Sequence, residues 1–314
     1  MAKTGELLTV SIFGSPFLIC NPRAGSGAAR RDVVQLRRHL AARGIEHEVV
    51  FTEHRGHASE IARTALKDGR RFLVAVGGDG TIHEVVNGMI EDDAPVKADA
   101  VLGVAASGTA SDFIKTFGIP ALPAHAAVHL DGPESFPIDI GKVTYESDGG
   151  RATRYFCNVA EVGLGAVVAR RASLLPRVLG PLLYPLALWL AMMSTRKSQV
   201  RVDLVDRTYE GEMFNLVVAN GQFFGSGMKI APRAAPTDGL LDIQVQHASK
   251  IEMLAQWPKV YRGEHVPHPD VLEAKRVRAS ITSERPLPIE ADGELLGHTP
   301  ATFELLKDAL RLKV

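Results

Sequence analysis

Hydrophobic positions follow two different patterns along the chain. Up to about residue 120, short apolar runs alternate with segments whose apolar residues recur at helical spacing. The apolar runs predict strands at 17–20, 48–52, 72–76 and 101–104, and the helical spacing predicts helices at 28–43, 58–68, 82–90 and 111–117. Strands that alternate with helices in this way predict a parallel sheet covered by helices.

The junctions between these strands and helices are rich in glycine. After the run at 72–76 the chain continues Gly77-Gly-Asp-Gly-Thr81, with Glu84 three residues further on. Thr81 and Glu84 predict a capping box, so the helix is expected to begin just after Thr81. Glycine tolerates positive φ and lets a ligand approach the backbone, and a helix N-terminus attracts anions. The pattern therefore favours a phosphate site over a tight turn that merely connects two elements.

Two further junctions have the same character. They are Asn21 to Gly27, which contains Ser26, and Ala105 to Thr109, which contains Gly108. In a parallel sheet, the loops that follow the strands emerge at the same edge, where ligands bind. Three glycine-rich loops are therefore expected to converge on one crevice.

The pattern becomes β-rich after residue 142. Alternating or β-branched stretches predict strands at 155–159, 200–205, 212–219, 241–246, 276–281 and 287–291, interrupted by a helical stretch at about 166–193. These segments predict an antiparallel sandwich or barrel. The expected domains are residues 1–142 and 143–302, with 303–314 as a tail. The expected fold class is thus α/β, with a parallel-sheet nucleotide-binding domain followed by an antiparallel β-sandwich domain.

Composition narrows the class of protein. The 36 basic and 36 acidic residues balance, so nothing points to a nucleic-acid partner. The 2 cysteines offer no disulfide framework, and the start MAKTGELLTV lacks the apolar core of a signal peptide. The apolar stretch at 174–193 is interrupted by prolines, which makes it a poor membrane span. We therefore expect a soluble, cytoplasmic protein.

Several nucleotide-binding motifs are missing. The sequence has no G-x-x-x-x-G-K-[ST] of a P-loop and no H-R-D or D-F-G of a protein kinase. Arg30 stands where the third glycine of a dinucleotide-binding fingerprint belongs, which disfavours a dehydrogenase. His265 and His268 are interpreted as solvated loop residues rather than metal ligands.

An ordered set of longer motifs is more specific. The segments NPRAGSG, VGGDGTIHEVVNG, SGTASDF, IDIGKV, PTDGLLDIQV and EADGELL occur in this order over nearly the whole chain. The sequence resembles the diacylglycerol kinase catalytic-domain family, which includes bacterial lipid kinases and the sphingosine and ceramide kinases. The resemblance implies the same two-domain fold, with the active site in the interdomain cleft and the end of the chain returning to the first domain.

The resemblance also implies an ATP- and Mg²⁺-dependent transfer of a phosphoryl group to a lipid hydroxyl. It places a nucleotide site on Asn21, Ser26, Thr52, Gly77, Gly78, Asp79, Gly80, Thr81, Glu84, Gly108 and Thr109. Asp79 would organise Mg²⁺, assisted by Asp139. The general base would be Glu294 by analogy with bacterial members, or Asp79 by analogy with sphingosine kinases. A structural Mg²⁺ would bind Asp238 and the carbonyls of Ala235 and Leu240.

This sequence departs from the family pattern in one loop. Ala106 stands in place of proline and Ser111 in place of asparagine, which is expected to loosen the loop and to alter nucleotide affinity or acceptor choice. Two alternatives stay open: a kinase for a soluble acceptor such as NAD, and a nucleotide-binding regulator without turnover. Among the lipids, diacylglycerol, phosphatidylglycerol, a sphingoid base and ceramide all stay open, and so does a homodimer.

A final expectation concerns the lipid surface. The leucine-rich stretch at 174–193 carries Trp189 and is flanked by Arg170, Arg171, Arg196 and Lys197. Cations and an indole suit the headgroup level of a membrane, whereas a core helix would explain only the leucines. We therefore expect peripheral contact with the inner membrane surface, with a core helix as the alternative.

Overall fold

A computed structural model describes residues 12–107, 111–121 and 123–314. The chain divides into two compact units, Met1–Ile138 with Asp308–Val314 (unit 1) and Asp139–Lys307 (unit 2). The sequence predicts a division a few residues later, after 142, and a C-terminal tail beginning at 303. The last residues of the chain belong to unit 1, where Arg311 and Leu312 pair with the first strand residues of β6.

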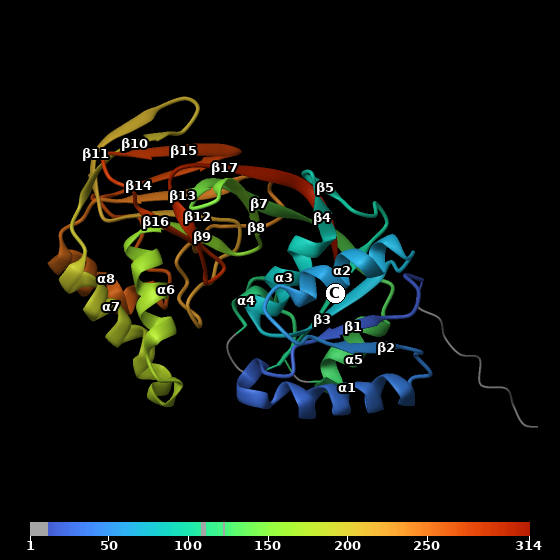
Figure 1. The fold of residues 1–314 in the computed structure, drawn as a ribbon. Coiled ribbons are helices and arrows are strands. Elements are labelled where there is room, and N and C mark those ends of the chain that lie inside the picture. Colours follow the sequence, from blue (N-terminus) through green and yellow to red (C-terminus); the bar gives the residue numbers. More distant parts are fainter. Residues whose placement is uncertain (1–11, 108–110, 122) are drawn as a thin grey trace, which may run out of the picture. The chain divides into compact units, whose positions relative to one another are not determined.

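Unit 1 is a parallel sheet between two layers of helices (Figure 1). Its strands run in the order β2, β1, β3, β6 and the end of β17, and every pair among them is parallel. Helices α1 and α5 cover one face and α2 and α3 the other. The strands are β1 (Phe17–Cys20), β2 (Glu48–Phe51), β3 (Phe72–Gly77) and β6 (Val101–Ala106), with a small hairpin of β4 (Ile90–Glu91) and β5 (Ala94–Pro95).

The helices of unit 1 follow the strands, and all except α5 were predicted. They are α1 (Ala29–Ala42), α2 (His57–Lys67), α3 (Asp79–Met89), α4 (Asp112–Phe117) and α5 (Pro123–Asp131), with a short 3-10 turn η1 (Ala24–Gly27) before α1. Strands β3 and β6 are buried along their whole length because helices cover both faces of the sheet. Helix α4 ends at Gly118, which takes φ +67°, as a glycine after a helix commonly does.

Unit 2 is an antiparallel β structure, which confirms the predicted sandwich class. One run of strands has the order β14, β13, β12, β9, β16, β17, and a second has the order β17, β15, β10, β11. The hairpin of β7 and β8 also pairs with β17. Residues near the start of β17 pair with β16, and residues after Pro300 pair with β15, so this strand takes part in both runs. A core that includes Val162, Leu216, Ile243, Ile281 and Phe303 fills the interior.

The strands of unit 2 are partly those predicted. They are β7 (Ser135–Ser147), β8 (Gly150–Phe156), β9 (Val159–Gly163), β10 (Ser198–Asp203), β11 (Thr208–Met213), β12 (Asn215–Ala219), β13 (Leu241–Gln246), β14 (Val271–Arg276), β15 (Arg278–Ser283), β16 (Pro288–Ala291) and β17 (Glu294–Lys313). The predicted strand at 212–219 is wrong in extent, because β11 ends at Met213 and β12 begins at Asn215. The sequence prediction missed β7, β14 and β17, and its strand at 155–159 runs across the end of β8 and the start of β9.

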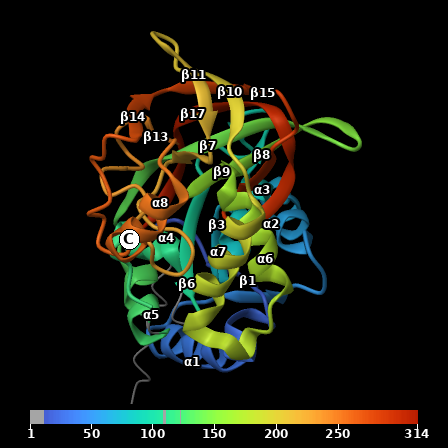
Figure 2. The same cartoon turned by 90° about the vertical axis from the view of Figure 1, so that its left-hand side faces the viewer.

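Three helices gather at one end of unit 2 (Figure 2). They are α6 (Leu164–Leu174), α7 (Leu183–Ser194) and α8 (Lys250–Val260), with a 3-10 segment η2 (Arg177–Leu182) between α6 and α7. The helical stretch predicted at 166–193 is therefore broken, at Pro176 and at the non-helical Gly180. Helix α8, which the sequence prediction missed, begins with a capping box of Ser249 and Glu252. Within the described part of the chain, no helix has the length and hydropathy needed to cross a bilayer.

Candidate active site

The glycine-rich junction after β3 is tight for a reason that differs from the prediction. The sequence predicts a positive φ at Gly77, Gly78 and Gly80, but none of the three has one. Gly77 is required because a Cβ there would lie 2.4 Å from the Thr81 hydroxyl oxygen. At Gly78 and Gly80 a Cβ would meet no described atom within 4 Å, so the space beside this turn is open to a ligand.

The helix that follows begins earlier than predicted. Helix α3 starts at Asp79, with Gly78 as an extended N-cap that has no side-chain cap, so the predicted capping box of Thr81 and Glu84 is wrong. Thr81 is buried instead. Since the first N–H groups of a helix have no partner within it, the first turn of α3 presents donors beside the open space at Gly78.

Glu84 contacts the neighbouring helix instead of its own. One of its carboxylate oxygens accepts the N–H of Gly56 at 2.9 Å and the other accepts the N–H of Ala58 at 3.1 Å. Gly56 is the N-cap of α2 and has no side chain to cap that helix. Glu84 therefore supplies the cap of α2 from α3.

Asp79 anchors the start of α4. Its carboxylate accepts the Ser111 hydroxyl at 3.0 Å and the backbone N–H groups of Asp112 and Phe113 at 2.9 Å and 3.0 Å. Ser111, one of the two departures from the family pattern, therefore contacts the acid of the GGDG motif directly. This contact ties the loop after β3 to the helix after β6.

The electrostatics around Asp79 suit a divalent cation. Burial raises the pKa of Asp79 to about 6 and the nearby charge of Asp112 adds to the effect, while the hydrogen bonds from Phe113, Asp112 and Ser111 oppose it. Asp112 is buried and forms an ion pair with Lys115 at 3.0 Å. The half-buried carboxylate of Asp79 and the buried carboxylate of Asp112 form a donor set that Mg²⁺ accepts, so these residues fit the predicted metal. Asp112 has no role in the sequence-based prediction.

The other predicted nucleotide residues lie on the loops at the same edge of the sheet. Asn21 follows β1 and its side-chain oxygen accepts the N–H of Arg23 at 3.0 Å. Thr52 follows β2 and donates its N–H to the Cys20 carbonyl at 2.9 Å. The N–H of Ser107, after β6, donates to the Gly77 carbonyl at 2.9 Å, which brings that loop beside the GGDG turn. Ser26 lies in η1, whereas Gly108 and Thr109 lie outside the described residues.

Within unit 2, Asp139 and the predicted structural metal segment are neighbours. Asp139 is fully buried, its carboxylate accepts the Gly239 N–H at 2.8 Å, and its own N–H donates to the Pro236 carbonyl at 2.8 Å. Asp139 thus fixes the turn that contains Asp238.

The Asp238 carboxylate and the Ala235 carbonyl, two of the predicted metal ligands of that turn, already have other partners. The Asp238 carboxylate lies 2.8 Å from the Lys275 ammonium and also accepts the N–H of Leu240 at 3.0 Å. The Ala235 carbonyl accepts the N–H groups of Thr237 and Asp238 at 2.7 Å and 3.1 Å. In this arrangement the Lys275 ammonium balances the charge of Asp238, so a Mg²⁺ ion at this turn would have to displace it.

The Asp-Gly-Glu turn between β16 and β17 is fixed from two sides. The Asp292 carboxylate accepts backbone N–H groups of Cys157 at 2.7 Å, Asn158 at 2.9 Å and Val159 at 3.2 Å. The Glu290 carboxylate accepts the N–H of Gly293 at 2.8 Å. Glu294, the predicted base, is half-buried at the first position of β17. The segment is therefore a true hairpin turn, and the turn also holds the backbone that carries Glu294.

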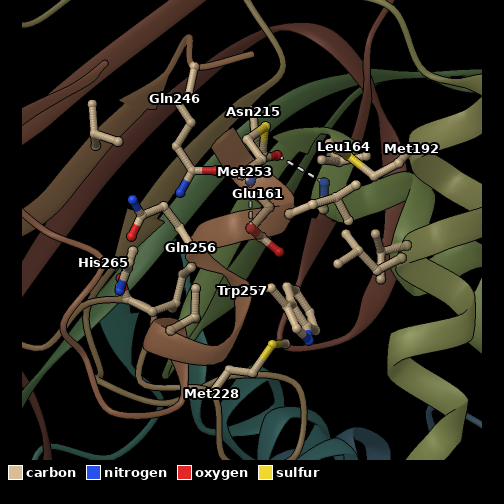
Figure 3. Close-up of a pocket in the computed structure, with 18 of the residues that line it drawn as sticks. Glu161, Leu164, Met192, Asn215, Met228, Gln246, Met253, Gln256, Trp257 and His265 are labelled. Atoms are coloured by element: carbon tan, nitrogen blue, oxygen red, sulfur yellow. Dashed lines mark hydrogen bonds between the residues drawn. The ribbon is translucent and has the colours of Figure 1, made fainter. Parts of the chain in front are cut away.

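A pocket with an apolar lining lies among α6, α7, α8 and the sheet of unit 2 (Figure 3). It encloses about 100 Å³. Most of its wall is hydrocarbon, thioether or indole, contributed among others by Leu164, Val168, Leu188, Met192, Met228, Met253 and Trp257. Methionine side chains adapt to the shape of an apolar partner. The pocket therefore suits a hydrocarbon ligand of variable shape.

One carboxyl group faces this apolar space. Glu161 lines the pocket, is only 4% exposed, and accepts the Asn215 amide at 2.7 Å. Asn215 in turn accepts the Gly165 N–H at 2.9 Å, which fixes the orientation of its amide. Glu161 lies directly opposite Glu290 in the pairing of β9 with β16. The sequence prediction missed both residues, although a lone acid in the apolar run Val159–Gly163 was a visible signal.

Burial perturbs the titration of this region. Burial raises the pKa of Glu161 to about 7, against the hydrogen bond from Asn215. Burial also raises the pKa of Glu290, and the charge of Glu161 adds to that effect. His265 also lines the pocket, where its Nε2 contacts the Ile230 carbonyl at 3.1 Å. His265 is buried, so its interpretation as a solvated loop residue is wrong.

The chain matches two protein families in succession. Residues 15–143 match the diacylglycerol kinase catalytic domain, and residues 158–314 match the YegS C-terminal NAD kinase beta sandwich-like domain. It is similar to a diacylglycerol kinase of Staphylococcus carnosus, with 28% identity over 94% of this chain and 93% of that protein. It is also similar to a diacylglycerol kinase of Staphylococcus epidermidis, with 30% identity over 94% of this chain and 90% of that protein.

The fold has close counterparts among solved structures. The crystal structure of a diacylglycerol kinase from Bacillus anthracis aligns with a TM-score of 0.70 and 21% identity, covering 95% of this chain and 96% of that one. Fold and motifs together define a two-domain α/β kinase with a β-sandwich domain. The chain belongs to the diacylglycerol kinase catalytic-domain family.

Proposed function

We propose that the protein is an ATP- and Mg²⁺-dependent lipid kinase that transfers the γ-phosphoryl group of ATP to the hydroxyl of a diacylglycerol-like lipid. The observation that carries the proposal is the apolar pocket of unit 2, whose wall is mostly aliphatic, thioether and indole. A soluble acceptor such as NAD would need a polar acceptor site instead. The names of the curated relatives, which are diacylglycerol kinases, support the same acceptor class.

The nucleotide half of the reaction belongs to unit 1. We assign the ATP phosphates to the GGDG turn, where Gly78 and Gly80 leave open space beside the first N–H groups of α3. Asp79 and Asp112 would hold Mg²⁺, which supplies charge neutralisation for the phosphoryl oxygens when bound. The remaining nucleotide contacts are proposed at Asn21, Ser26, Thr52, Gly77, Thr81, Gly108 and Thr109. Glu84, the other predicted contact, caps α2 with both of its carboxylate oxygens.

The acceptor half needs a base for the lipid hydroxyl proton. We assign this role to Glu294, since the carboxylates of Asp292 and Glu290 hold the turn from which Glu294 projects. Asp139 would position the turn at Gly239 rather than take the proton, because its carboxylate already accepts the Gly239 N–H. Asp79, the alternative base, already accepts three hydrogen bonds that stabilise its charged form.

An apolar surface supports action at a membrane. The outer sides of α6, η2, α7 and α8 expose large apolar side chains, namely Leu174, Leu182, Leu186, Trp189, Met193, Ile251 and Leu254. The inner side of α7 is core, since Ala187, Leu188 and Ala191 are buried. The core-helix interpretation therefore applies to the inner face of α7, and we propose the interfacial interpretation for its outer face. Exposed Arg170, Arg171 and Arg196 flank this surface, which we propose contacts the anionic inner membrane leaflet of the cell from the cytoplasm.

A panel of acceptors tests the proposed function. Purified protein is incubated with γ-labelled ATP, Mg²⁺ and mixed micelles of diacylglycerol, phosphatidylglycerol, a sphingoid base or ceramide, with NAD as the soluble acceptor. We expect label in a lipid and none in NAD. Label in NAD alone would establish the soluble-acceptor alternative. ATP binding without any labelled product would establish the regulatory one.

Two substitutions test the division of roles. Asp79→Asn and Glu294→Gln should each lower turnover by about a hundredfold or more, the range for acid–base partners. Glu294→Gln should keep the ATP affinity of the wild type, because the residue acts on the acceptor. Wild-type turnover in Glu294→Gln would reject it as the base.

A further inference from the structure

Glu161 is an unusual residue for a pocket that takes hydrocarbon. It is 4% exposed and its carboxyl lies at the apolar wall near Trp257 and Met253 (Figure 3). A Cβ on Gly165 would lie 2.2 Å from a Glu161 oxygen, so the start of α6 makes room for this carboxyl. An ionised carboxylate is costly in such a place unless it is paired with a cation.

Among the described residues, Glu161 forms no ion pair, and its one side-chain hydrogen bond comes from the neutral Asn215 amide. The group across the strand pair is another carboxyl, Glu290, which is fully buried and has one oxygen without a hydrogen-bond partner. On the pocket wall, burial lowers the pKa of His265, so that ring is neutral where Glu161 titrates. His268 also lines the pocket. The ammonium groups of Lys197 and Lys250 lie over the Phe214 ring, 5.6 Å and 5.8 Å from its centroid.

Glu161 and Glu290 are two buried carboxyl groups next to each other. Like charges in a buried pair disfavour ionisation of both groups together. Burial raises the pKa of both carboxyls, that of Glu161 to about 7. Glu161 lines the pocket and Glu290 does not, so Glu161 is the member of the pair that a ligand in the pocket would meet.

We propose that the pocket binds a hydrocarbon chain of the acceptor lipid together with one proton at Glu161, which makes Glu161 a specificity-determining residue that favours uncharged chains. This inference rests on the proposed function only for the identity of the ligand as the acceptor. A chain that fills the pocket removes the last water around the carboxyl, so the neutral form is favoured in the complex. An anionic chain end would bury a second charge beside this carboxyl without a paired cation, so it is disfavoured.

The direction of the pH dependence follows from linkage. In the free protein the pKa of Glu161 is about 7, raised by burial. Chain binding raises that pKa further, so the complex holds more proton than the free protein. Affinity is then full below the free-protein pKa and falls as the pH rises above it, by up to about tenfold per pH unit.

The two tryptophans of the chain give a direct assay. Trp189→Phe leaves Trp257, which lines the pocket, as the single tryptophan. A long-chain alcohol brominated at its far end is titrated into this variant and quenches Trp257 when it binds. The same titration is made across neutral pH with Glu161→Gln added, which keeps the shape of the side chain and cannot ionise. Glu284→Gln, at an exposed position of unit 2, is the matched control.

The expected result is an affinity that falls above neutral pH in the Trp189→Phe protein and in the Glu284→Gln control. The Glu161→Gln protein should bind the probe with a flat pH profile. A flat profile without the Glu161 change, an unchanged slope with it, or no quenching at any pH would each overturn the proposal. Because the assay needs no turnover, lipid phosphorylation without pH-linked quenching would reject this inference and leave the kinase assignment standing. Quenching that depends on pH, without phosphorylation of any lipid, would instead reject the kinase assignment and leave this inference standing.

Discussion

The contact of Glu84 with α2 can be tested by removing the carboxylate. Both of its oxygens accept backbone N–H groups, from Gly56 and Ala58, at the start of a helix whose N-cap has no side chain. Replacing a capping side chain with alanine costs about 0.5–2 kcal/mol, and a hydrogen bond to a charged group contributes about 1.5–3 kcal/mol. Glu84 is half-buried, so we expect Glu84→Ala to lower the free energy of unfolding by about 2 kcal/mol.

The assay compares stability with nucleotide binding. For a unit of this size, a loss of about 2 kcal/mol corresponds to a fall in Tm of about 4–8 °C. Hydrogen exchange should accelerate first at the amides of Gly56 and Ala58, which lose their acceptor. Glu84→Gln, which keeps one carbonyl oxygen, should lose about half as much stability.

Glu60 provides the control. It lies in the first turn of the same helix and is exposed, so Glu60→Ala should change the free energy of unfolding by no more than about 0.5 kcal/mol. The reasoning is refuted if Glu84→Ala unfolds like Glu60→Ala while its KM for ATP rises steeply. That result would make Glu84 a nucleotide contact rather than a cap.

Three further outcomes are expected. If the Lys275 ammonium takes the place of a metal at Asp238, then Lys275→Met should increase the rise in Tm that added Mg²⁺ produces, and Asp238→Ala should abolish that rise; equal Mg²⁺ stabilisation of all three proteins would leave no metal at this turn. Burial raises the pKa of Glu161 from 4.5 to about 7, so the wild type should lose stability relative to Glu161→Gln as the pH rises through that window in urea titrations, and parallel curves would contradict the shift. Replacing the exposed Arg170, Arg171 and Arg196 with glutamine should weaken co-sedimentation with anionic vesicles and leave the ATP affinity unchanged. Undiminished vesicle binding would place the docking surface elsewhere. Lys197 is left in place, because its ammonium donates to the His247 carbonyl at 2.6 Å.

Local patterns were sufficient for most of unit 1. A buried strand such as β3, flanked by glycines and a periodic helix, leaves few alternatives. The predicted bounds differ from the observed ones by a residue or two, except that α3 begins three residues before its predicted start. Unit 2 was harder, because β7 and β17 are long strands that bend and change partners, and alternation does not tell which strand pairs with which. The prolines near 176–185 correctly indicated a broken helix, although the position of the break at Gly180 did not follow from them.

For the candidate active site, too, short-range features could be predicted from the sequence and long-range contacts could not. Residues close together in the chain were enough to predict the strand-turn-helix units, the position of Asn21, Thr52 and the GGDG turn at strand ends, and the hairpin that carries Glu294. Long-range packing was needed to show that Glu84 caps a different helix, that Asp79 holds the start of α4, and that Glu161 faces Glu290 beside an apolar pocket. Each of these contacts joins residues far apart in the sequence. The free-energy cost of burying a carboxyl depends on the groups around it, and those are known only from the folded structure.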